Sequence, residues 1–368
     1  MDLHFYMKKC LQLAKLGQYY VAPNPMVGAV LVESGEINEK QETRNEKIIG
    51  EGWHKEFGGP HAEVNCFKNA EENGYTDFSN CTLFVSLEPC SHYGKTPPCA
   101  NLIVEKGVKR VVIGMKDPNP LVAGKGIEIL ERNGIEVVVG VLEDECRELN
   151  KRFLMLHEHH RPYVILKWAQ TKDGYVDKLR VESLECRVGA PNGDSVELNK
   201  PLVISTPVTK QLVHKMRAEN MAIMVGTNTV LKDNPKLNVT RWVGRNPIRV
   251  TVDRHGRLED AALQDRGRCA TGKWKILDDS APTIVYRENT DWEYILNDLA
   301  QRGIHSILVE GGTTLLNHIL ATGIYDEIHV EVADMEIGEG VRAPEVTLPE
   351  EYEEIEGNRL YQIMNYEL

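Results

Sequence analysis

A histidine, a glutamate and two cysteines within the first hundred residues could together hold a catalytic metal ion. His61 and Glu63 stand in the stretch GGPHAEV, and Cys90 and Cys99 stand in LEPCSHYGKTPPC. A catalytic zinc ion takes three nitrogen or thiolate ligands from the protein and keeps a fourth position open for water. His61, Cys90 and Cys99 supply such a set. Because Glu63 is not needed as a ligand, we expect it to carry a proton from that water to a leaving amine.

The spacing of these residues follows the zinc-dependent base deaminases, with one difference. Those enzymes show H-x-E followed by P-C-x-x-C. In this chain Pro89-Cys90 is separated from Cys99 by the eight-residue loop SHYGKTPP. We predict that Cys90 follows a strand and that Cys99 begins a helix, whose positive end favours a thiolate. A bound zinc ion would bring the pKa of its water towards neutrality.

Other interpretations of the same residues stay open. A histidine at a helix start and buried cysteines also occur without a metal, although the full combination with the Pro-Cys corner favours a metal site. A structural zinc ion would need a fourth protein ligand, for which His92 is the candidate. A zinc-stabilised scaffold without activity would have no need of Glu63.

Composition and charge indicate an acidic globular protein and argue against a membrane-spanning or nucleic-acid-binding one. The 368 residues are 42% hydrophobic and 27% charged, which is typical of a globular chain long enough for two domains. The opening stretch MDLHFYMKKCLQLAKLG predicts an amphipathic helix and not a signal peptide, and no apolar run approaches the roughly 20 residues of a membrane span. We therefore expect a cytoplasmic protein whose eight cysteines stay reduced. The net charge of -12 disfavours nucleic acid as the main partner.

Around the candidate metal site the sequence predicts a first α/β domain over residues 1–148. Its predicted strands are 26–32, 48–54, 81–87, 108–115 and 135–141, and its predicted helices are 1–17, 61–74, 99–107 and 126–134. The charged stretch 34–47 is expected to be a solvated excursion of a hairpin. A single helix is expected over 142–162, with residues 149–161 as the linker.

Inside that linker, LHEHHRP superficially matches H-E-x-x-H, but the spacing of its histidines is wrong for that zinc motif. Its residues are expected to be exposed: His157, Glu158, His159 and His160.

A second α/β domain is expected over residues 162–368. Its predicted strands are 163–170, 221–226, 247–253, 281–287, 305–312 and 327–333, and its predicted helices are 208–219, 292–303 and 313–323. The region 178–203 has little periodicity and is expected to be an insertion. Two junctions, MAIMVGTNTVLKDNP and SILVEGGTTLLNHIL, place glycine between a strand and a helix start, where backbone amides suit a phosphate. Neither junction contains a Rossmann or Walker pattern.

Five stretches closely resemble one known family, the bifunctional deaminase/reductase of riboflavin biosynthesis. They are APNPMVGAVLV, IIGEGWHKEFGGPHAEV, LFVSLEPCSHYGKTPPC, VKRVVIGMKDPNPLVAGKG and GIEVVVG. The resemblance implies a cytidine-deaminase-like α/β/α domain followed by a dihydrofolate-reductase-like α/β domain. It also implies deamination of a diaminopyrimidinone that carries phosphoribosylamine, reduction of the product's ribose by NADPH, and a homo-oligomer, either a dimer or a tetramer. The eight-residue gap between the two cysteines is this family's own pattern.

The resemblance also implies binding residues. In the deaminase domain these are substrate contacts: Asn24, which would hold the base, and His54, Lys95, Thr96 and Asn119. In the reductase domain the implied cofactor contacts are Gln170, Thr229, Asp233, Gly311, Gly312, Thr313 and Thr314. The implied contacts with the phosphorylated substrate are Lys167, Arg217, Leu237 and Glu310.

The second domain departs from the family pattern at several positions. Thr171-Lys172 stands where the family has Ser-Leu, Pro201 and Val203 replace a serine and a tryptophan, and the stretch 179–200 is additional. These departures bear on cofactor affinity. A second hypothesis, a deaminase of nucleic-acid bases with a C-terminal binding module, has the acidic total and the long Cys-Cys loop against it.

Overall fold

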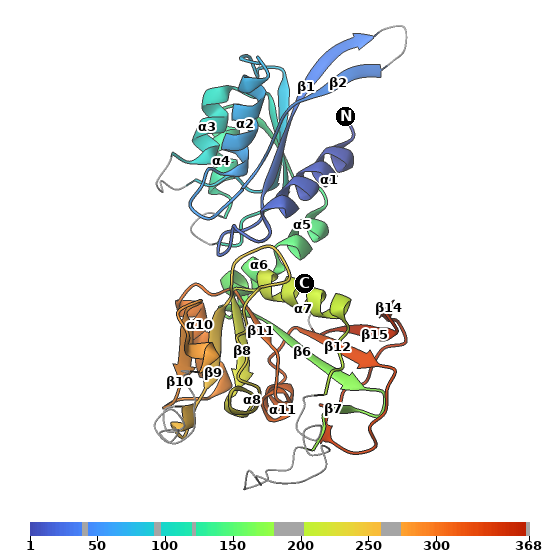
Figure 1. Cartoon of the computed structure of the whole chain (residues 1–368). Coiled ribbons are helices and arrows are strands. Elements are labelled where there is room, and N and C mark those ends of the chain that lie inside the picture. The colour runs from blue at the N-terminus through green and yellow to red at the C-terminus, as the bar shows by residue number, and fades with distance from the viewer. Residues whose placement is uncertain (39–42, 92–96, 120–122, 180–201, 259–273, 366–368) are drawn as a thin grey trace, which may run out of the picture. The chain divides into compact units, whose positions relative to one another are not determined.

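The computed structural model describes residues 1–38, 43–91, 97–119, 123–179, 202–258 and 274–365 (Figure 1). Its internal contacts divide the chain into two units. The first is residues 1–162 with Leu299–His305, and the second is residues 163–298 with the chain from Ser306 onward. Most of the predicted insertion at 178–203 lies outside the described residues, which leave out 180–201, and so does the tip of the predicted excursion at 39–42.

The first unit is built on a five-stranded sheet with the order β2-β1-β3-β4-β5. The strands are β1 Gly28–Asn38, β2 Thr43–Trp53, β3 Cys81–Leu87, β4 Arg110–Met115 and β5 Glu136–Val139. The helices are α1 Leu3–Ala14, the 3₁₀ helix η1 Lys15–Gly17, α2 Ala62–Glu72, α3 Cys99–Lys106, α4 Lys125–Arg132, α5 Glu143–Leu149 and α6 Lys151–His159. Strand β1 pairs antiparallel with β2 and β3, whereas β3, β4 and β5 run parallel. Helices α2, α3 and α4 cover one face of the sheet, and α1 and α5 the other (Figure 1).

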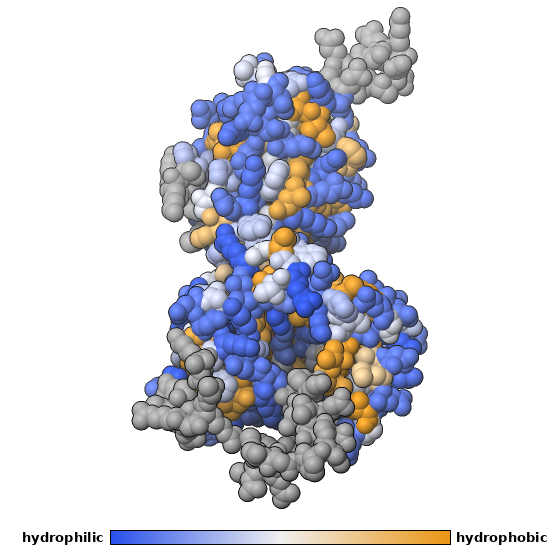
Figure 2. Space-filling model, in the orientation of Figure 1, coloured by the Kyte–Doolittle hydropathy of each residue, from blue (hydrophilic) through white to orange (hydrophobic). Residues whose placement is uncertain are grey.

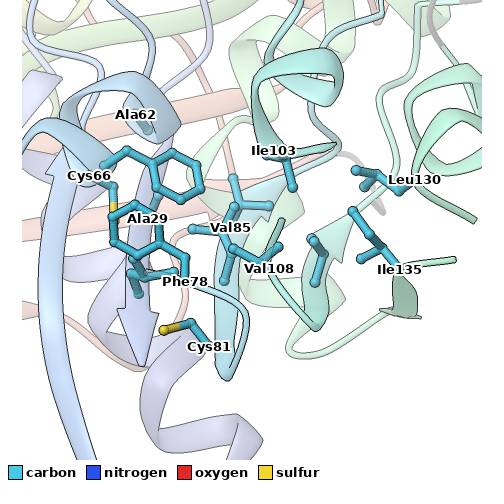
Figure 3. Packing of buried hydrophobic residues seen from close by; sticks show 14 of the residues in the cluster. Ala29, Ala62, Cys66, Phe78, Cys81, Val85, Ile103, Val108, Leu130 and Ile135 are labelled. Carbon is cyan, nitrogen blue, oxygen red and sulfur yellow. The ribbon is translucent and has the colours of Figure 1, made fainter. Parts of the chain in front are cut away.

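Alternation along the strands creates a core on each face of this sheet. Successive side chains of a strand point to opposite faces, so Ala29 belongs to one buried cluster and Val30 to the other. Figure 3 shows part of the first cluster, in which Ile103 of α3 lies next to Val85 of β3 and Leu130 of α4 lies next to Ile135. Each fully buried aliphatic side chain contributes roughly 1.5–3 kcal/mol. These two cores hold the helix starts in place relative to the strand ends.

Helix α1 is amphipathic, as its sequence predicts. Its buried residues include Met7 and Cys10, which pack on the sheet, whereas Phe5 on the same helix and Leu16 just after it are exposed. The visible surface is otherwise mostly hydrophilic (Figure 2).

Gly52 sets the position of α2. A Cβ on this residue would lie 2.3 Å from the backbone nitrogen of Cys66 and 2.4 Å from the carbonyl oxygen of Ala62. The first turns of α2 therefore lie directly against the backbone of β2, which no larger residue would permit. This contact fixes the helix start that carries His61 and Glu63.

The hairpin of β1 and β2 is longer than predicted. The first strand was expected to end at residue 32 and the second to begin at residue 48. Their pairing instead continues to Asn38 and Thr43 through two register shifts. Backbone hydrogen bonds sustain this pairing, so it needs no alternating apolar side chains. The polar composition of 34–47 therefore concealed strand structure.

The single helix predicted over 142–162 is wrong, because the chain forms α5 and α6 with a break at Asn150. The buried side chain of Asn150 accepts a hydrogen bond from Met26 N at 2.8 Å and donates one to Met26 O at 2.9 Å. Leu154 of α6 is buried in the same core as α1. The segment expected as a linker therefore packs as part of the first unit and ties down the loop that contains Asn24.

The second unit is built on an eight-stranded sheet with the order β10-β9-β8-β11-β6-β12-β15-β14, and β13 pairs with β7 separately. The strands are β6 Tyr163–Thr171, β7 Tyr175–Asp177, β8 Ala222–Gly226, β9 Ile248–Val252, β10 Thr283–Tyr286, β11 Ser306–Val309, β12 Glu327–Ala333, β13 Val341–Arg342, β14 Glu353–Ile355 and β15 Asn358–Met364. The helices are α7 Pro207–Glu219, α8 Thr227–Asp233, η3 Lys275–Leu277, α10 Trp292–Gln301 and α11 Thr313–Thr322. Strands β10, β9, β8, β11, β6 and β12 run parallel, and β15 joins antiparallel to β12.

Several short elements of this unit were not predicted. Strands β7, β13 and β14 have three residues or fewer, and α8 has seven. Strand β15 buries only Asn358 and Tyr361, so it has no regular apolar face. Long-range pairing with β12, which a local pattern does not contain, forms this strand.

Replacing Asn150 with alanine should lower the free energy of unfolding of the first unit by about 2 kcal/mol, because both backbone groups of Met26 lose their partner. Thermal or urea unfolding measures this loss. The matched control is Asn133→Ala, which removes an exposed bond at the end of another helix and should cost below about 0.5 kcal/mol. Equal losses in the two variants would contradict the assigned role of Asn150.

Candidate functional site

The three predicted metal ligands meet at the ends of three elements. His61 is the residue that caps the N-terminus of α2, Cys90 follows β3, and Cys99 is the first residue of α3. The Nδ1 atom of His61 lies 3.6 Å from Cys90 Sγ and 3.4 Å from Cys99 Sγ. All three ligand atoms lie within 4.8 Å of one another. The three side chains, which the sequence predicted to lie together, are therefore close to one another in the structure.

This arrangement fits a tetrahedral zinc ion. Zn–N distances of about 2.1 Å and Zn–S distances of about 2.3 Å at tetrahedral angles separate the nitrogen from each sulfur by about 3.6 Å. The observed separations of 3.6 and 3.4 Å agree with that value. One imidazole and two thiolates also form a donor set that zinc prefers over magnesium or calcium.

The protonation of the two cysteines also favours a bound cation. A hydrogen bond from Cys99 lowers the pKa of Cys90 to about 4, and bonds from His61 and from the Cys99 backbone act in the same direction. The pKa of Cys99 is raised, because its thiol donates to Cys90 and is buried. Without a cation the pair therefore holds one thiolate, since a second negative charge beside the first is unfavourable. A divalent cation removes that penalty and allows both cysteines to ionise.

Glu63 lies in the first turn of α2, two residues after His61, and is 3% exposed. Burial raises the pKa of Glu63, and the charge of Cys90 adds to this effect. A raised pKa makes a carboxyl group a stronger base towards the proton that it must accept. Its place beside the cluster suits a group that carries protons.

Glu88 holds the backbone around Asp117 and Gly124 in place, a role that sequence reasoning missed. Its buried Oε1 accepts hydrogen bonds from the backbone N–H groups of Gly126 and Ile127 at 3.0 and 3.4 Å. Its Oε2 accepts from Asp117 and Gly124 at 3.3 and 3.0 Å. The glutamate of the LEPC corner thus ties the backbone at Asp117, Gly124, Gly126 and Ile127 to the segment just before Cys90. The signal in the sequence was a charged residue directly after a mostly apolar strand.

Asn24 and His54 form a pair inside the first unit. His54 is 3% exposed, and its Nδ1 donates to the Pro60 carbonyl oxygen at 3.0 Å. Because a carbonyl only accepts, Nε2 carries no hydrogen and accepts from Asn24 Nδ2 at 3.1 Å. Burial lowers the pKa of His54, in agreement with a neutral ring. The His54 ring also packs edge-on against His61, with ring centroids 5.4 Å apart, which places the pair beside the cluster.

The remaining predicted residues of this unit are placed only in part. Asn119 is half-buried in the loop that Glu88 holds, and its backbone N–H donates to Asp117 Oδ1 at 2.8 Å. Lys95, Thr96 and the alternative ligand His92 lie outside the described residues.

The second unit contains a cavity of about 650 Å³ next to the ends of β8 and β11. Eight of the predicted residues line it: Lys167, Thr229, Asp233, Glu310, Gly311, Gly312, Thr313 and Thr314. The two predicted strand–helix junctions adjoin there, since Gly312 N donates to Thr229 Oγ1 at 3.1 Å and Gly226 N donates to Gly311 O at 3.1 Å. Carboxyl ends of adjacent parallel strands are the usual ligand site of open α/β sheets.

Three predicted residues are not among the described residues that line this cavity. Arg217 of α7 binds the two carboxylate oxygens of Glu310 at 2.7 and 2.6 Å. Burial raises the pKa of Glu310, but the charge and hydrogen bonds of Arg217, together with the charges of Lys167 and His214, leave that pKa below its ordinary value. Leu237 is buried, and Gln170 lines a separate cavity of about 410 Å³ with residues 342–348. Arg217 thus acts on the larger cavity through Glu310.

A further cavity of about 430 Å³ adjoins the larger one and was not expected from the sequence. The two share Asn228, Thr229, Gly312 and Thr314 in their walls. Apolar residues such as Trp292 and Ile295 line the inner part, while Arg254 and Arg257 belong to its wall and are exposed. The loop that carries these arginines follows β9 and shows no motif.

Among the described residues, those that depart from the family pattern cause little change in the structure. Thr171 is buried, and its hydroxyl donates to Asp173 Oδ1 at 2.5 Å and accepts from Tyr175 N at 3.0 Å. Thr171 thus supplies the hydroxyl of the serine that it replaces. Val203 is exposed and lines the larger cavity, and Pro201 lies outside the described residues.

Comparison with known proteins identifies the family. A model described as the cytidine and deoxycytidylate deaminase zinc-binding region matches residues 1–115, and the RibD C-terminal domain matches residues 162–362. The riboflavin biosynthesis protein RibD of Aquifex aeolicus is 37% identical over 347 residues, which cover 91% of this chain and 88% of that protein. The chain belongs to the RibD family. RibD of Escherichia coli is 33% identical over 365 residues, which cover 93% and 90% of the two chains.

Solved structures of RibD proteins confirm the predicted two-part α/β fold. The diaminohydroxyphosphoribosylaminopyrimidine deaminase/5-amino-6-(5-phosphoribosylamino)uracil reductase of Thermotoga maritima is 34% identical, with a TM-score of 0.77 and 98% of each chain covered. Acinetobacter baumannii RibD is 31% identical, with the same TM-score and coverage. Among the described residues, no helix is both long and apolar enough to span a bilayer.

Purified protein should contain about one zinc ion per chain, and Cys99→Ser should lose most of it, because an alcohol is a poor zinc ligand. Elemental analysis after dialysis measures the metal. Cys146→Ala is the control, since Cys146 is buried but lies outside the cluster, and it should keep its zinc. Full zinc content in Cys99→Ser would contradict the ligand assignment.

Proposed function

We propose that the chain catalyses two successive steps of riboflavin biosynthesis. The first unit removes the amine from 2,5-diamino-6-(5-phosphoribosylamino)pyrimidin-4(3H)-one by hydrolysis. The second unit reduces the ribosyl group of 5-amino-6-(5-phosphoribosylamino)uracil to the ribitylamino form with NADPH. The observation that carries the proposal is the cluster of His61, Cys90 and Cys99 beside Glu63, in a chain of the RibD family.

In the deamination step Glu63 transfers the proton. His61, Cys90 and Cys99 would hold the zinc ion, which when bound acts as a Lewis acid and lets water lose a proton near neutral pH. Glu63 takes that proton and passes it to the amino group that leaves as ammonia. Its burial excludes bulk water from the transfer.

Asn24 orients the pyrimidine, and His54 orients Asn24. Because Asn24 Nδ2 donates to His54 Nε2, the amide is fixed with Oδ1 as its remaining acceptor. That oxygen suits a hydrogen bond from an amino or ring N–H group of the base. We keep the sequence assignments of Lys95, Thr96 and Asn119 as further substrate contacts.

For the reduction step we assign the two adjoining cavities to NADPH. The cofactor supplies a hydride when bound, and catalysis then depends on its close placement against the opened ribose. Gly311, Gly312 and the start of α11 suit the pyrophosphate, since a helix N-terminus favours an anion. The smaller, largely apolar cavity takes the adenosine, with Arg254 and Arg257 at the 2′-phosphate.

The remaining assigned cofactor contacts in the larger cavity are Thr229, Asp233, Thr313 and Thr314. Gln170, which lines the separate cavity of about 410 Å³, is the last assigned contact.

The substrate end of the larger cavity carries complementary charge. Lys167 provides an ammonium group for the substrate phosphate, and the ion pair of Arg217 and Glu310 borders it. We keep the assignment of the buried Leu237 as a further substrate contact. We further propose a homo-oligomer, a dimer or a tetramer, that works in the cytoplasm on small molecules. A deaminase of nucleic-acid bases is disfavoured by the net charge of -12.

Glu63→Gln should retain zinc and lose at least about a hundredfold in deamination rate, because an amide does not shuttle protons. Ammonia release from the diaminopyrimidine ribotide measures the rate. NADPH oxidation with the deaminated substrate should stay unchanged and shows that the chain is folded. Glu72→Gln, at the exposed end of the same helix, is the control. Normal deamination by Glu63→Gln would refute the catalytic assignment.

The double variant Arg254→Gln/Arg257→Gln should raise the KM for NADPH by about tenfold or more and leave the KM for NADH unchanged, because the lost charges would face the 2′-phosphate, which NADH lacks. Steady-state reduction with each cofactor measures the two KM values. Arg359→Gln, on β15 over Tyr352, is the control. An equal effect on both cofactors would contradict the assignment of the smaller cavity.

A further inference from the structure

Glu331 of β12 lies on the same face of the sheet as Lys167 of β6. The two strands run parallel, with His329 paired to Lys167 and Glu331 paired to Ala169. Paired residues of neighbouring strands share a face, and alternate residues of one strand share it too. The small side chain of Ala169 leaves room for Lys167 to reach along the sheet, and its Nζ lies 3.8 Å from Glu331 Oε2.

Glu331 is buried and held firmly at both oxygens. Its side chain is 1% exposed. Asn358 Nδ2 donates to Oε1 at 2.7 Å, and Ser205 Oγ donates to Oε2 at 2.6 Å. A buried carboxylate is costly unless it is hydrogen-bonded and paired with a positive charge. The two neutral donors fix its orientation, and the ammonium of Lys167 supplies the charge.

Lys167 in turn depends on this carboxylate. Its side chain is 12% exposed and lines the larger cavity. Burial lowers the pKa of Lys167, the carboxylates of Glu331 and Glu310 raise it, and Arg217 lowers it. Glu310 is already engaged through both oxygens by Arg217. Glu331, whose hydrogen-bond donors Ser205 and Asn358 are neutral, is therefore the carboxylate most available to the ammonium.

Other charged and titratable groups surround Lys167 on the strands and helices packed against it. They are His329 of β12, Glu310 after β11, Arg217 and Lys210 of α7, Asp177 of β7, and Lys232 and Asp233 of α8. These groups are the same in any variant of Glu331, so a change in pH dependence in such a variant reports the loss of this one charge.

We propose that Glu331 is a positioning residue of the reductase site, which holds the Lys167 ammonium against the wall of the larger cavity so that it meets the anionic end of the substrate. This inference rests on the proposed reductase function. It assigns Ser205 and Asn358 the task of holding Glu331 in place. Residues from β12, β15 and the segment before α7 thereby act on substrate binding through one lysine.

The test is Glu331→Gln in the full-length chain, which keeps the shape of the side chain and removes its charge. The kcat/KM for reduction should fall about tenfold, mainly through a higher KM for the phosphoribosyl substrate. The alkaline limb of its pH profile should also move to lower pH. Removing the carboxylate lowers the pKa of Lys167, so the lysine loses its proton, and with it its charge, earlier as pH rises.

A double-mutant cycle separates this role from a general effect on stability. In a Lys167→Met background, Glu331→Gln should cause no further loss, because the lysine through which Glu331 acts is gone. Circular dichroism and thermal unfolding of the variant chains measure whether the second unit is folded. Glu327→Gln is the matched control, since Glu327 is a buried carboxylate of the same strand that bonds Tyr163, Gln362 and His329 and not Lys167.

The possible results are distinct. An unchanged kcat/KM and pH profile in Glu331→Gln, or an equal loss in both backgrounds, would overturn the role of Glu331. A wild-type chain that deaminates but never oxidises NADPH would overturn the reductase function instead. In that event, calorimetric binding of ribose 5-phosphate by the same variants still decides whether Glu331 acts through Lys167.

Discussion

Two cysteine sulfurs and an imidazole nitrogen, all within 4.8 Å and largely out of water, impose the constraint on which the first unit depends. Both sulfurs cannot be anionic at that distance without a cation, so the protein must hold three elements together until the metal binds. Gly52 brings the start of α2 against the sheet, and Glu88 anchors the loop behind Cys90. The two cores of the sheet supply the stability that this arrangement requires.

The two units use the same structural solution for different chemistry. Each places functional groups where a parallel strand ends and a helix begins, because side chains and amides converge there on a fixed framework. In the first unit that edge presents soft ligands and a carboxyl group. In the second it presents glycines and a lysine, which suit a phosphorylated cofactor and substrate. Partly buried ion pairs, such as that of Arg217 with Glu310, hold the side chains at the second edge in place.

Local sequence patterns predicted the parts of the structure that local forces determine. Strands β3 and β12 match their predicted bounds, because continuous or alternating apolar runs define them. The ligand set followed from residue types and spacing. The break at Asn150, strand β15 and the roles of Glu88 and Glu331 were missed, since each depends on a partner distant in the sequence. The donors to Glu88 lie up to 39 positions away, and Asn150 bonds a residue 124 positions away.

The most direct test of the account is X-ray absorption spectroscopy at the zinc edge of the purified wild-type chain. The account predicts two sulfur atoms at about 2.3 Å and two nitrogen or oxygen atoms at about 2.0–2.1 Å, one of them from solvent. A shell of four sulfur atoms, or one with no sulfur, would contradict a catalytic centre built on His61, Cys90 and Cys99.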